Sequence, residues 1–454
     1  MEQTTSHSKT RAQWLVFFAA WAIFFLIALV WNSASRESFK DLPAHWNIDG
    51  IFYDNIALNL SQGRGFVVDF EQTDWRQAYE AANEATGPSE LYKWVLQFEG
   101  SGPTTMRSPG YPYVVSILYR IFGWRLDVVR YAGMVLASLG LALIVTWCFR
   151  KFGGLVALVA ALTTMIDYSV MQTSGMVASE PLAVFAFALA FVVLAAFVEN
   201  PSNGRAIFCG LTFAGLFLTR GNWNLGLMLV VAITALLAVP KIRERLLPIV
   251  PRHIAIALLT AICLATPWWI RNCLTVQHFQ PFGSAGASGI CAAYCDESLA
   301  EYGNWKGAAF HRNQNAVFKE IDFASTPLAQ REYLVGRSSM SKATQWASAN
   351  WHSLPKLAIY RYLSHWGLFN AAVPKPLQYV NAVWVMFGLV GCLLLSARQR
   401  NLLAFVLILD ALIVMLTWAH LGRYGIPIRP LLHVGCALTI VRFWQYVLAE
   451  RNAT

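Results

Sequence analysis

An acidic residue at the start of an amphipathic stretch is the first candidate for catalysis in this sequence. Asp49 lies in Asn47-Ile-Asp-Gly-Ile-Phe-Tyr-Asp-Asn-Ile-Ala-Leu-Asn-Leu-Ser-Gln-Gly-Arg-Gly-Phe66, shortly after the first long hydrophobic segment. Asp49, Tyr53 and Ala57 recur every four residues, which places them on one face of a helix. The neighbouring face is mostly apolar, as in helices that lie at a membrane surface. Asp49 is therefore a candidate general base. Its alternative role is to cap the helix, and the two roles are compatible because a helix N-terminus favours an ionised carboxylate.

A second acid, Glu180, stands in Ser179-Glu-Pro-Leu182 between two apolar segments. Its side chain is too short to extend far along a membrane, and Pro181 marks the start of a helix. A charged residue at the centre of a membrane helix costs about 2.5–3.5 kcal/mol on insertion scales, so a charge retained near one indicates a polar cavity or a charged partner. We predict that Glu180 and Asp49 lie in one cavity, although they are far apart in the sequence.

Further charged residues lie inside or beside apolar segments: Asp167, Arg220, Arg271, Asp410, Arg423 and Arg429. All of them except Asp410 fall at the outer ends of their predicted spans. For Arg429, and also for Arg423, we expect the long side chain to extend to the lipid headgroups.

The composition indicates a protein that crosses the membrane several times. The 454 residues are 56% hydrophobic and only 13% charged, which excludes a disordered or nucleic-acid-binding protein. The net charge of +10 needs no acidic partner, because most basic residues flank hydrophobic segments. Residues 12–35 carry no charge and are long enough to span a bilayer, so we expect an uncleaved anchor there.

Hydrophobic segments predict an all-α polytopic integral membrane protein with about ten transmembrane helices. Seven of them fall near 13–31, 131–149, 153–171, 181–198, 377–397, 402–418 and 426–447, and three more fall between 205 and 272. Counting from a cytosolic N-terminus places the basic connectors in the cytosol, as the positive-inside rule requires. These connectors contain Arg150, Lys151, Arg205, Lys241, Arg252, Arg398, Arg400 and Arg451.

Two long polar segments fall on the other side of the membrane in this count. They are the first outer segment (32–126) and the second outer segment (273–375), and each contains a stretch that predicts an interfacial helix, at 113–122 and 346–369. The chain then divides into a catalytic membrane module (1–272), the second outer segment (273–375) and a C-terminal module of three spans (376–454). Cys291 and Cys295 share the second outer segment, where a local disulfide is a candidate.

Five motifs in a fixed order resemble one enzyme family. They are Asp49-x3-Tyr53-x3-Ala57-x-Asn59-Leu60-x2-Gly63-x-Gly65-Phe66, Arg107-x-Pro-Gly-Tyr-Pro112, Ser179-Glu-Pro-Leu182, Pro267-Trp-x-Ile-Arg-Asn272 and Arg423-Tyr-x-Ile-Pro-x-x-Pro430. Together they resemble the GT-C glycosyltransferases, in the bacterial branch related to protein O-mannosyltransferases and lipid A aminoarabinose transferases. Each motif alone is weak, but their order over nearly the whole chain is fairly specific.

The resemblance implies roles for particular residues. Asp49 matches the catalytic acid of the first outer loop in that family, and Glu180 matches the acid of the second outer loop. Gly50 stands where many members have a second acid, and Asp54 is a partial substitute. Asp49, Asp54 and Glu180 are candidate ligands of a divalent cation, which is a candidate cofactor. Arg107 occupies the place of a basic residue near the lipid phosphate.

The implied reaction moves a sugar from a polyprenyl-phosphate donor to a lipid, glycan or protein acceptor on the periplasmic side of a bacterial inner membrane. Cations stabilise the leaving phosphate, and Asp49 accepts the proton of the acceptor hydroxyl, which gives inversion at the anomeric carbon. Glu180 joins Asp49 as a catalytic residue. The candidate substrate-binding residues are Tyr53, Asp54, Arg107, Tyr111, Arg220, Arg271, Arg423 and Tyr424.

Two alternatives remain open from the sequence. A polytopic transporter predicts internal repeats and ionisable residues near the middle of the membrane; we find no convincing repeat, and only Asp410 is such a residue. A non-catalytic membrane scaffold related to the GT-C enzymes is the other alternative, because the second acid is missing. Release of free polyprenyl phosphate from a donor would separate an enzyme from both.

Overall fold

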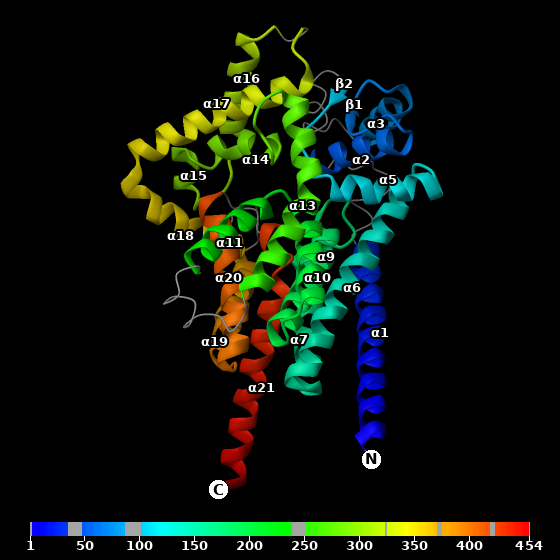
Figure 1. Ribbon diagram of the computed structural model, residues 1–454, viewed down its shortest axis with the longest axis vertical. Helices are drawn as coiled ribbons and strands as arrows, with labels where there is room; N and C mark the ends of the chain where they lie inside the picture. The colour runs from blue at the N-terminus through cyan, green and yellow to red at the C-terminus, as the bar shows by residue number, and fades with distance from the viewer. Residues whose placement is uncertain are drawn as a thin grey trace.

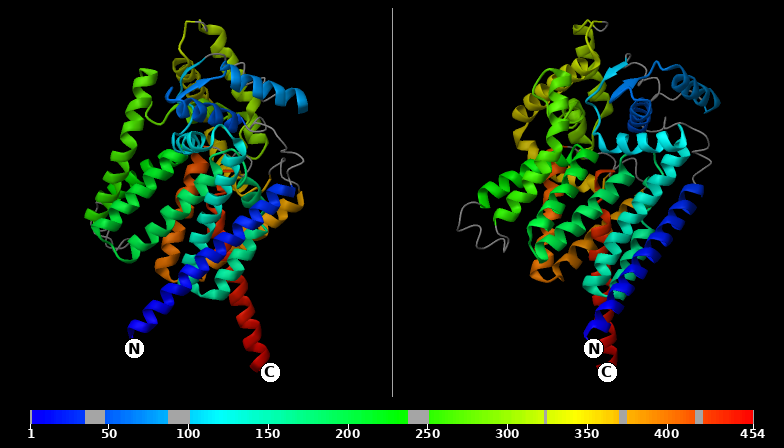
Figure 2. Two further views of the ribbon diagram at one scale, coloured as in Figure 1. Left: turned by 90° about the vertical axis from the view of Figure 1, so that its right-hand side faces the viewer. Right: turned by 45° about the vertical axis from the view of Figure 1, so that its right-hand side comes forward.

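The chain forms a helical bundle with a cap of shorter elements at one end (Figure 1). The computed structural model describes residues 2–34, 48–86, 101–237, 251–322, 325–369, 375–417 and 423–453. The bundle consists of α1 (Glu2–Ala34), α6 (Leu126–Phe152), α7 (Gly154–Met165), α9 (Glu180–Glu199), α10 (Asn203–Thr219), α11 (Trp223–Leu237), α13 (Pro251–Val276), α19 (Lys375–Leu393), α20 (Ala397–Leu416) and α21 (Arg429–Ala453). Both chain termini lie at the end of the bundle opposite the cap (Figures 1 and 2).

Seven helices of the described residues are long and apolar enough to cross a membrane. They include α1, α6, α9, α13, α19, α20 and α21, and they confirm an all-α polytopic membrane protein. The other three predicted spans fall on shorter helices, α7, α10 and α11, so the count of ten stays a prediction. The predicted span 153–171 is interrupted, because α7 ends at Met165 and α8 (Tyr168–Thr173) begins after Asp167.

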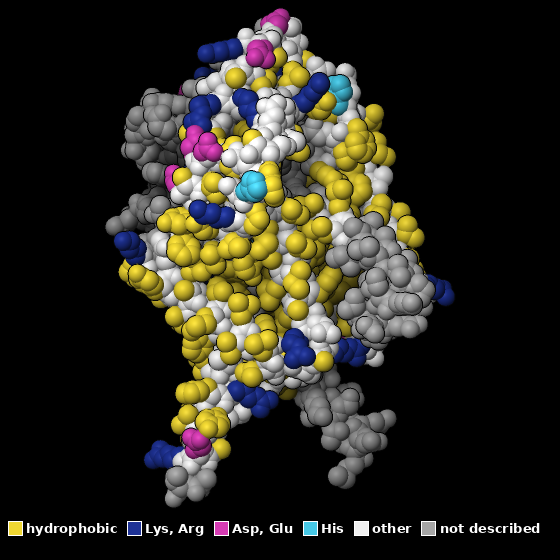
Figure 3. Space-filling view, turned by 90° about the vertical axis from the view of Figure 1, so that its left-hand side faces the viewer, with side chains coloured by type: hydrophobic (Ala, Val, Ile, Leu, Met, Phe, Trp, Pro, Cys, Tyr) yellow, Lys and Arg dark blue, Asp and Glu magenta, His cyan; other side chains and the backbone are white. Residues whose placement is uncertain are grey.

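The surface of the bundle has the distribution of side chains that a bilayer requires. One face shows a broad hydrophobic band in the middle, with Lys and Arg side chains below it and mixed charges on the cap above it (Figure 3). Inside the bundle, small residues let helices approach closely. At the contact of α19 with α21, a Cβ added to Gly391 would lie 1.8 Å from the carbonyl oxygen of Gly435, so this seam admits no side chain at that point.

The first outer segment folds into a small unit with its own core. It contains α2 (Ile48–Ser61), α3 (Thr73–Thr86), α5 (Gly110–Phe122) and two short antiparallel strands, β1 (Val67–Asp69) and β2 (Ser101–Pro103), which pair with Val68 opposite Gly102. The predicted helix at 113–122 is confirmed as α5, and its Tyr113, Ile117 and Ile121 form an exposed apolar stripe. Its position at the membrane interface stays a prediction.

The prediction that α2 lies at the membrane surface is wrong. Residues 50–60 are all buried, because α2 packs against α5 and β1 and shares a core with aromatic residues of α3. The helix therefore lies in the interior of the first outer segment, and it is partly accessible in its first turn and at its last residue, Ser61. That first turn contains Asp49.

The second outer segment is helical and packs onto the first. It contains α14 (Ser284–Gly289), η2 (Ile290–Ala292), α15 (Asp296–Ala300), α16 (Gly307–Glu320), α17 (Leu328–Ala349), η3 (Trp351–Ser353) and α18 (Leu354–His365). The predicted interfacial stretch 346–369 becomes the end of α17, η3 and α18. Cys291 and Cys295 are free thiols, so the candidate disulfide is not formed.

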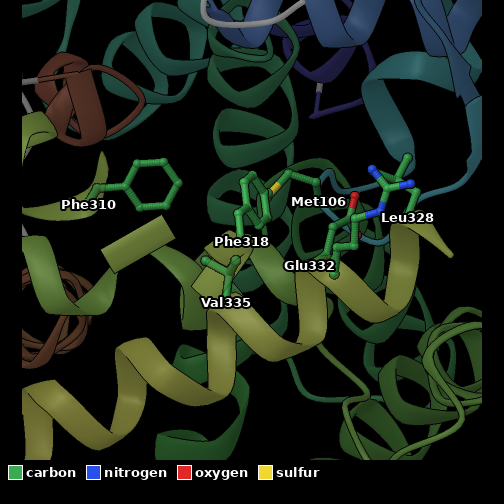
Figure 4. A pocket seen from close by; sticks show the side chains of 7 residues that line it. Met106, Phe310, Phe318, Leu328, Glu332 and Val335 are labelled. Atoms are coloured by element: carbon green, nitrogen blue, oxygen red, sulfur yellow. The ribbon is translucent and has the colours of Figure 1, made fainter. Parts of the chain in front are cut away.

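A buried acid joins the two outer segments. The carboxylate of Glu332 on α17 accepts hydrogen bonds from the hydroxyl of Thr104, from the amide and hydroxyl of Thr105 and from the hydroxyl of Ser284. Burial raises the pKa of Glu332, and these hydrogen bonds oppose the shift. Beside it, Met106, Phe318 and Val335 line a small apolar pocket (Figure 4). The peptide that leads to Arg107 is thereby fixed to the second outer segment.

Candidate active site

Asp49 and Glu180 meet at one guanidinium group. Asp49 lies in the first turn of α2, Glu180 is the first residue of α9, and Arg423 opens the short helix η4 (Arg423–Gly425). Nη2 of Arg423 lies 3.2 Å from Oδ2 of Asp49 and 2.7 Å from Oε1 of Glu180. Nε of Arg423 also donates to Oε1 of Glu180 at 2.9 Å. The predicted proximity of the two acids is thus confirmed.

Two more arginines complete the cluster. Nη2 of Arg107 lies 2.9 Å from Oδ1 of Asp49, and Nη2 of Arg220 lies 3.7 Å from Oε1 of Glu180. The cluster therefore holds three guanidinium groups around two carboxylates. With all five groups ionised it carries an excess positive charge, and an anionic ligand would balance that charge.

The two acids differ in accessibility. The side chain of Asp49 is 36% exposed, whereas that of Glu180 is 1% exposed. Within the described part of the chain, Oε2 of Glu180 has no hydrogen-bond partner. Burial alone would lower the pKa of Arg423, but the charges of Glu180 and Asp49 outweigh it and raise that pKa above its ordinary value. Arg423 thus stays a cation. Asp49 is the more accessible of the two acids.

Aromatic side chains surround the arginines. The rings of Tyr53 and Tyr111 meet edge to face with centroids 4.9 Å apart. Arg107 lies over Phe52 at 4.7 Å, and Arg220 lies over Tyr424 at 4.8 Å. Such contacts favour a cation in a partly dry site and fix the plane of each guanidinium.

The phenol of Tyr53 stays protonated under ordinary conditions. Burial, followed by the charge of Asp49, raises the pKa of Tyr53 to about 12, and its hydroxyl also hydrogen-bonds the side chain of Ser179. The pKa of Tyr111 is raised in the same direction, again chiefly by burial. Both tyrosines are therefore neutral groups that can donate a hydrogen bond near the acids.

Asp54 does not join the cluster. Its carboxylate is fully buried and accepts hydrogen bonds from four side chains, the indoles of Trp75 and Trp124 and the phenols of Tyr79 and Tyr119. These donors come from α3, α5 and the segment before α6, so Asp54 ties the first outer segment together. We predicted a substrate contact for Asp54 and now infer a structural role.

Arg271 is also placed apart from the two acids. Its guanidinium donates to the carbonyl oxygens of Thr104 at 2.6 Å and Phe66 at 2.9 Å, and it lies over the ring of Trp268 at 4.9 Å. These contacts attach the first outer segment to α13. Arg271 thus supports the loop before Arg107, and a direct contact with substrate stays a prediction.

The candidate cation ligands do not converge. In the residues that the structure describes, no three His, Cys, Asp or Glu side chains are arranged to hold a metal ion. Asp54 is committed to its four donors, and the guanidinium of Arg423 lies between Asp49 and Glu180. The residues present do not fit a divalent cation in this arrangement.

A second set of buried charges was only partly foreseen. The expectation that Arg429 extends to lipid headgroups is wrong, because it is 4% exposed and its Nη1 lies 2.8 Å from Oδ2 of Asp167. Asp410 is likewise buried, 2.8 Å from Nε2 of His365. The sequence shows that Asp167 and Arg429 carry opposite charges beside apolar segments. It does not show that the two residues pair, because their spacing in the sequence does not indicate which helices pack together.

Comparisons with known proteins address the family. Residues 106–270 match the family model described as dolichyl-phosphate-mannose-protein mannosyltransferase. No curated protein matches the sequence. Among solved structures, ArnT from Cupriavidus metallidurans bound to undecaprenyl phosphate is 14% identical, with 94% of this chain and 77% of that chain covered and a TM-score of 0.41. The apo state of the same protein is 14% identical, with 96% and 78% covered and a TM-score of 0.36.

The matched segment contains three of the residues placed in or beside the cluster by the structure, Arg107, Glu180 and Arg220. Residues 106–270 are thus similar to this mannosyltransferase family, in agreement with the resemblance that the motifs indicated.

Proposed function

We propose that this protein is a membrane glycosyltransferase that moves a sugar from a polyprenyl-phosphate donor to a hydroxyl of a lipid, glycan or protein acceptor. The observation that carries the proposal is the accessible carboxylate of Asp49 held between two arginines, Arg107 and Arg423. The relation to the GT-C enzymes over residues 106–270 supports the reaction class.

The arginines suit the leaving group. When the bond between the anomeric carbon and the phosphate oxygen breaks, its electron pair stays on the phosphate. Arg107 and Arg423 are two guanidinium groups that can offer paired N–H donors to such oxygens. Because both are largely buried, with side chains 13% and 21% exposed, their attraction for the phosphate is screened less than it would be in water.

Asp49 takes the role of general base. The acceptor oxygen forms a bond to the anomeric carbon from the face opposite the phosphate, and its proton passes to a carboxylate oxygen of Asp49. A single displacement of this kind inverts the configuration at that carbon. No covalent sugar–enzyme intermediate is required.

Donor binding would also release the base. Each oxygen of Asp49 is engaged by an arginine, Oδ1 by Arg107 and Oδ2 by Arg423. A donor phosphate competes for the same guanidinium groups, so its arrival leaves the carboxylate able to accept a proton. Donor binding before acceptor deprotonation is the order that this arrangement favours.

Glu180 is assigned to the donor sugar. Its Oε2 is buried with no hydrogen-bond partner among the described residues, and an unsatisfied buried carboxylate oxygen is costly. A hydroxyl of the sugar is a suitable donor to this atom. Glu180 would then orient the sugar while its Oε1 keeps Arg423 in place.

The site faces the periplasm in this proposal, and both termini face the cytoplasm of a bacterial inner membrane. Support comes from the position of both termini at the end opposite the cap (Figure 1). Basic residues at that end, such as Arg150 and Lys151 in the last turn of α6, agree with the positive-inside rule.

The test is donor turnover by the purified full-length protein in lipid vesicles. A panel of polyprenyl-phosphate sugars, supplied with envelope lipids, glycans and protein acceptors, is incubated with the protein, and free polyprenyl phosphate and the glycosylated product are measured. We expect turnover with at least one donor, loss of turnover in Asp49→Asn, and retention in the control Asp127→Asn, whose carboxylate pairs with Arg125 at an exposed site. Equal turnover by Asp49→Asn and wild type would contradict the proposed base.

A further inference from the structure

A buried charge cluster lies on the segments that lead to Glu180 and Arg423. Oδ2 of Asp167 lies 2.8 Å from Nη1 of Arg429 and 3.0 Å from Nε2 of His433. Arg429 also donates from Nη1 to Asn381 at 3.1 Å and from Nη2 to the carbonyl oxygen of Trp366 at 3.0 Å. Asp167, Arg429 and His433 are each less than 5% exposed. The reaction proposed above uses none of them.

The first segment held by this cluster leads to Glu180. Oδ1 of Asp167 caps α8 by accepting from the amides of Ser169 at 2.9 Å and Val170 at 3.4 Å. After α8, backbone hydrogen bonds such as that from the amide of Met176 to Thr173 form a compact connection that ends at α9. One oxygen of Asp167 thus fixes the start of the connection that ends at Glu180, and the other oxygen binds α21.

The second segment carries Arg423. Between η4 and α21, the amide of Ile428 donates to Gly425 at 3.0 Å, and the amide of Leu431 donates to Ile428 at 3.0 Å. These successive turns leave little freedom between Arg423 and Arg429. His433 lies one turn further along α21, where it reaches the same oxygen of Asp167 as Arg429 does.

The turn that contains Arg423 also packs closely against the end of α18, at His365, and against the next residue, Trp366. A Cβ added to Gly425 would lie 3.0 Å from the carbonyl oxygen of His365 and 3.2 Å from its Nε2, which is tighter than ordinary contact. Arg429 binds the carbonyl oxygen of the next residue, Trp366. Nε2 of His365 in turn lies 2.8 Å from Oδ2 of Asp410, another buried residue.

We propose that Asp167 is a positioning residue, which acts through Arg429 to hold Arg423 and Glu180 at the separation that donor binding requires. The inference rests on the proposed function. Asp167 fits this role because a single carboxylate joins the connection before Glu180 to the helix after Arg423. Nη2 of Arg423 must stay near two acids at once, and a displacement of about 1 Å in such a site can lower activity on the order of 10²-fold.

The main test replaces Arg429 by Lys. The variant keeps the positive charge, but a single ammonium group cannot reproduce the fork that spans Asp167, Asn381 and Trp366. We expect KM for the donor to rise on the order of 10-fold or more when it is measured below the melting temperature of the variant, which the loss of these buried contacts lowers. The matched control Arg125→Lys, at an exposed pair with Asp127, should leave both values unchanged.

A second variant guards against simple loss of folding. Asp167→Asn combined with Arg429→Gln removes both charges, so that neither is left buried without its partner. We expect this variant to fold and still to show the raised KM for the donor. Asp167→Asn alone is a third variant. If Arg429→Lys, Asp167→Asn and the combined variant all failed to fold, the cluster would only stabilise the fold, and the inference would be wrong.

A double-mutant cycle then asks whether Asp167 acts through Arg423. Adding Asp167→Asn to Arg423→Lys should raise KM little beyond Arg423→Lys alone, because both changes remove the same placement. Glu199 pairs with Lys151 away from the cluster and serves as the control. Adding Glu199→Gln to Arg423→Lys should leave KM at the value of Arg423→Lys alone. Multiplicative effects of Asp167→Asn and Arg423→Lys would overturn the inference.

The outcomes separate the two proposals. If the wild-type protein is active and Arg429→Lys has the same turnover and the same KM for the donor, the positioning role is overturned and the proposed function is left intact. No wild-type turnover with any donor and acceptor of the panel would overturn both.

Discussion

Asp49 and Asp54 lie on the same helix and have opposite surroundings. Asp49 is partly exposed and is held by two arginines, whereas Asp54 is fully buried and is held by two indoles and two phenols. An ionic partner can be drawn away by a competing phosphate, because the ligand brings a charge of its own. Four neutral donors anchored in a core have no such competitor. The same residue type thus serves chemistry in one environment and architecture in the other.

The largest effect should come from Asp49→Asn. Because general bases contribute typically 10²- to 10⁴-fold, we expect kcat to fall by about that factor while the melting temperature stays near the wild-type value. Rates of release of free polyprenyl phosphate and a thermal melt of the same preparation measure the two quantities. A large loss of stability would assign to Asp49 the kind of role that Asp54 has.

Asp54→Ala should show the opposite pattern. Removing the carboxylate leaves three buried donors and the partly buried indole of Trp124 without an acceptor, which should lower the free energy of unfolding by about 2–4 kcal/mol. The measurement is thermal or denaturant unfolding of the full protein, compared between the variant and the wild type. Unchanged stability together with lost turnover would place Asp54 in the chemistry after all.

Arg→Lys substitutions should likewise divide into those that weaken donor binding and those that lower stability. Arg107→Lys and Arg423→Lys should raise KM for the donor by about 10-fold, because an ammonium group loses the paired N–H donors. Arg271→Lys should mainly lower the melting temperature, since Arg271 holds carbonyl oxygens of the first outer segment. A raised KM with normal stability in Arg271→Lys would restore Arg271 to the donor site.

The titration of Tyr53 should report the charge of Asp49. A tyrosine whose pKa is raised to about 12 in the folded state stabilises the protein below its ordinary pKa of about 10, and this contribution is lost as the pH rises towards 12. In Asp49→Asn the Coulombic contribution of Asp49 to the raised pKa disappears, so tyrosinate absorbance should appear at a lower pH. Difference spectra against Tyr53→Phe isolate this residue. An unchanged titration would mean that burial alone sets this pKa.

Chelation should have the smallest effect. A divalent cation between Asp49 and Glu180 would have to displace Arg423, and Asp54 is committed elsewhere, so we expect turnover to survive thorough chelation. Turnover lost on chelation and restored by added Mg²⁺ would establish the cation predicted from the sequence.

The fold was predictable where local pattern determines it. The length of the hydrophobic segments located α1, α6, α9 and the C-terminal helices. The positions and the motifs of Asp49 and Glu180 predicted that they lie in one site. The burial of α2 was not predictable from its own periodicity, because its cover comes from α5 and β1 and its core partners include α3.

Long-range pairs between charged groups escaped prediction for the same reason. The donors to Asp54 lie 21 to 70 positions later in the chain, and Arg429 lies 262 positions from Asp167. Such pairs depend on which helices pack together, and helix packing leaves no regular spacing in the sequence. Arg107 and Arg271 were both predicted to bind substrate, and their partners in the structure distinguish them. Arg107 pairs with Asp49, whereas Arg271 donates to carbonyl oxygens of Thr104 and Phe66.

The bridge made by Arg423 sets the order in which the site is completed during synthesis. A chain that grows from its N-terminus delivers Asp49 first, Glu180 much later, and Arg423 only after 243 more residues. Until then, Glu180 lacks the guanidinium that lies closest to it in the finished protein. A nascent chain thus contains both acids before the cation that joins them, and every product truncated before Arg423 would lack the assembled centre.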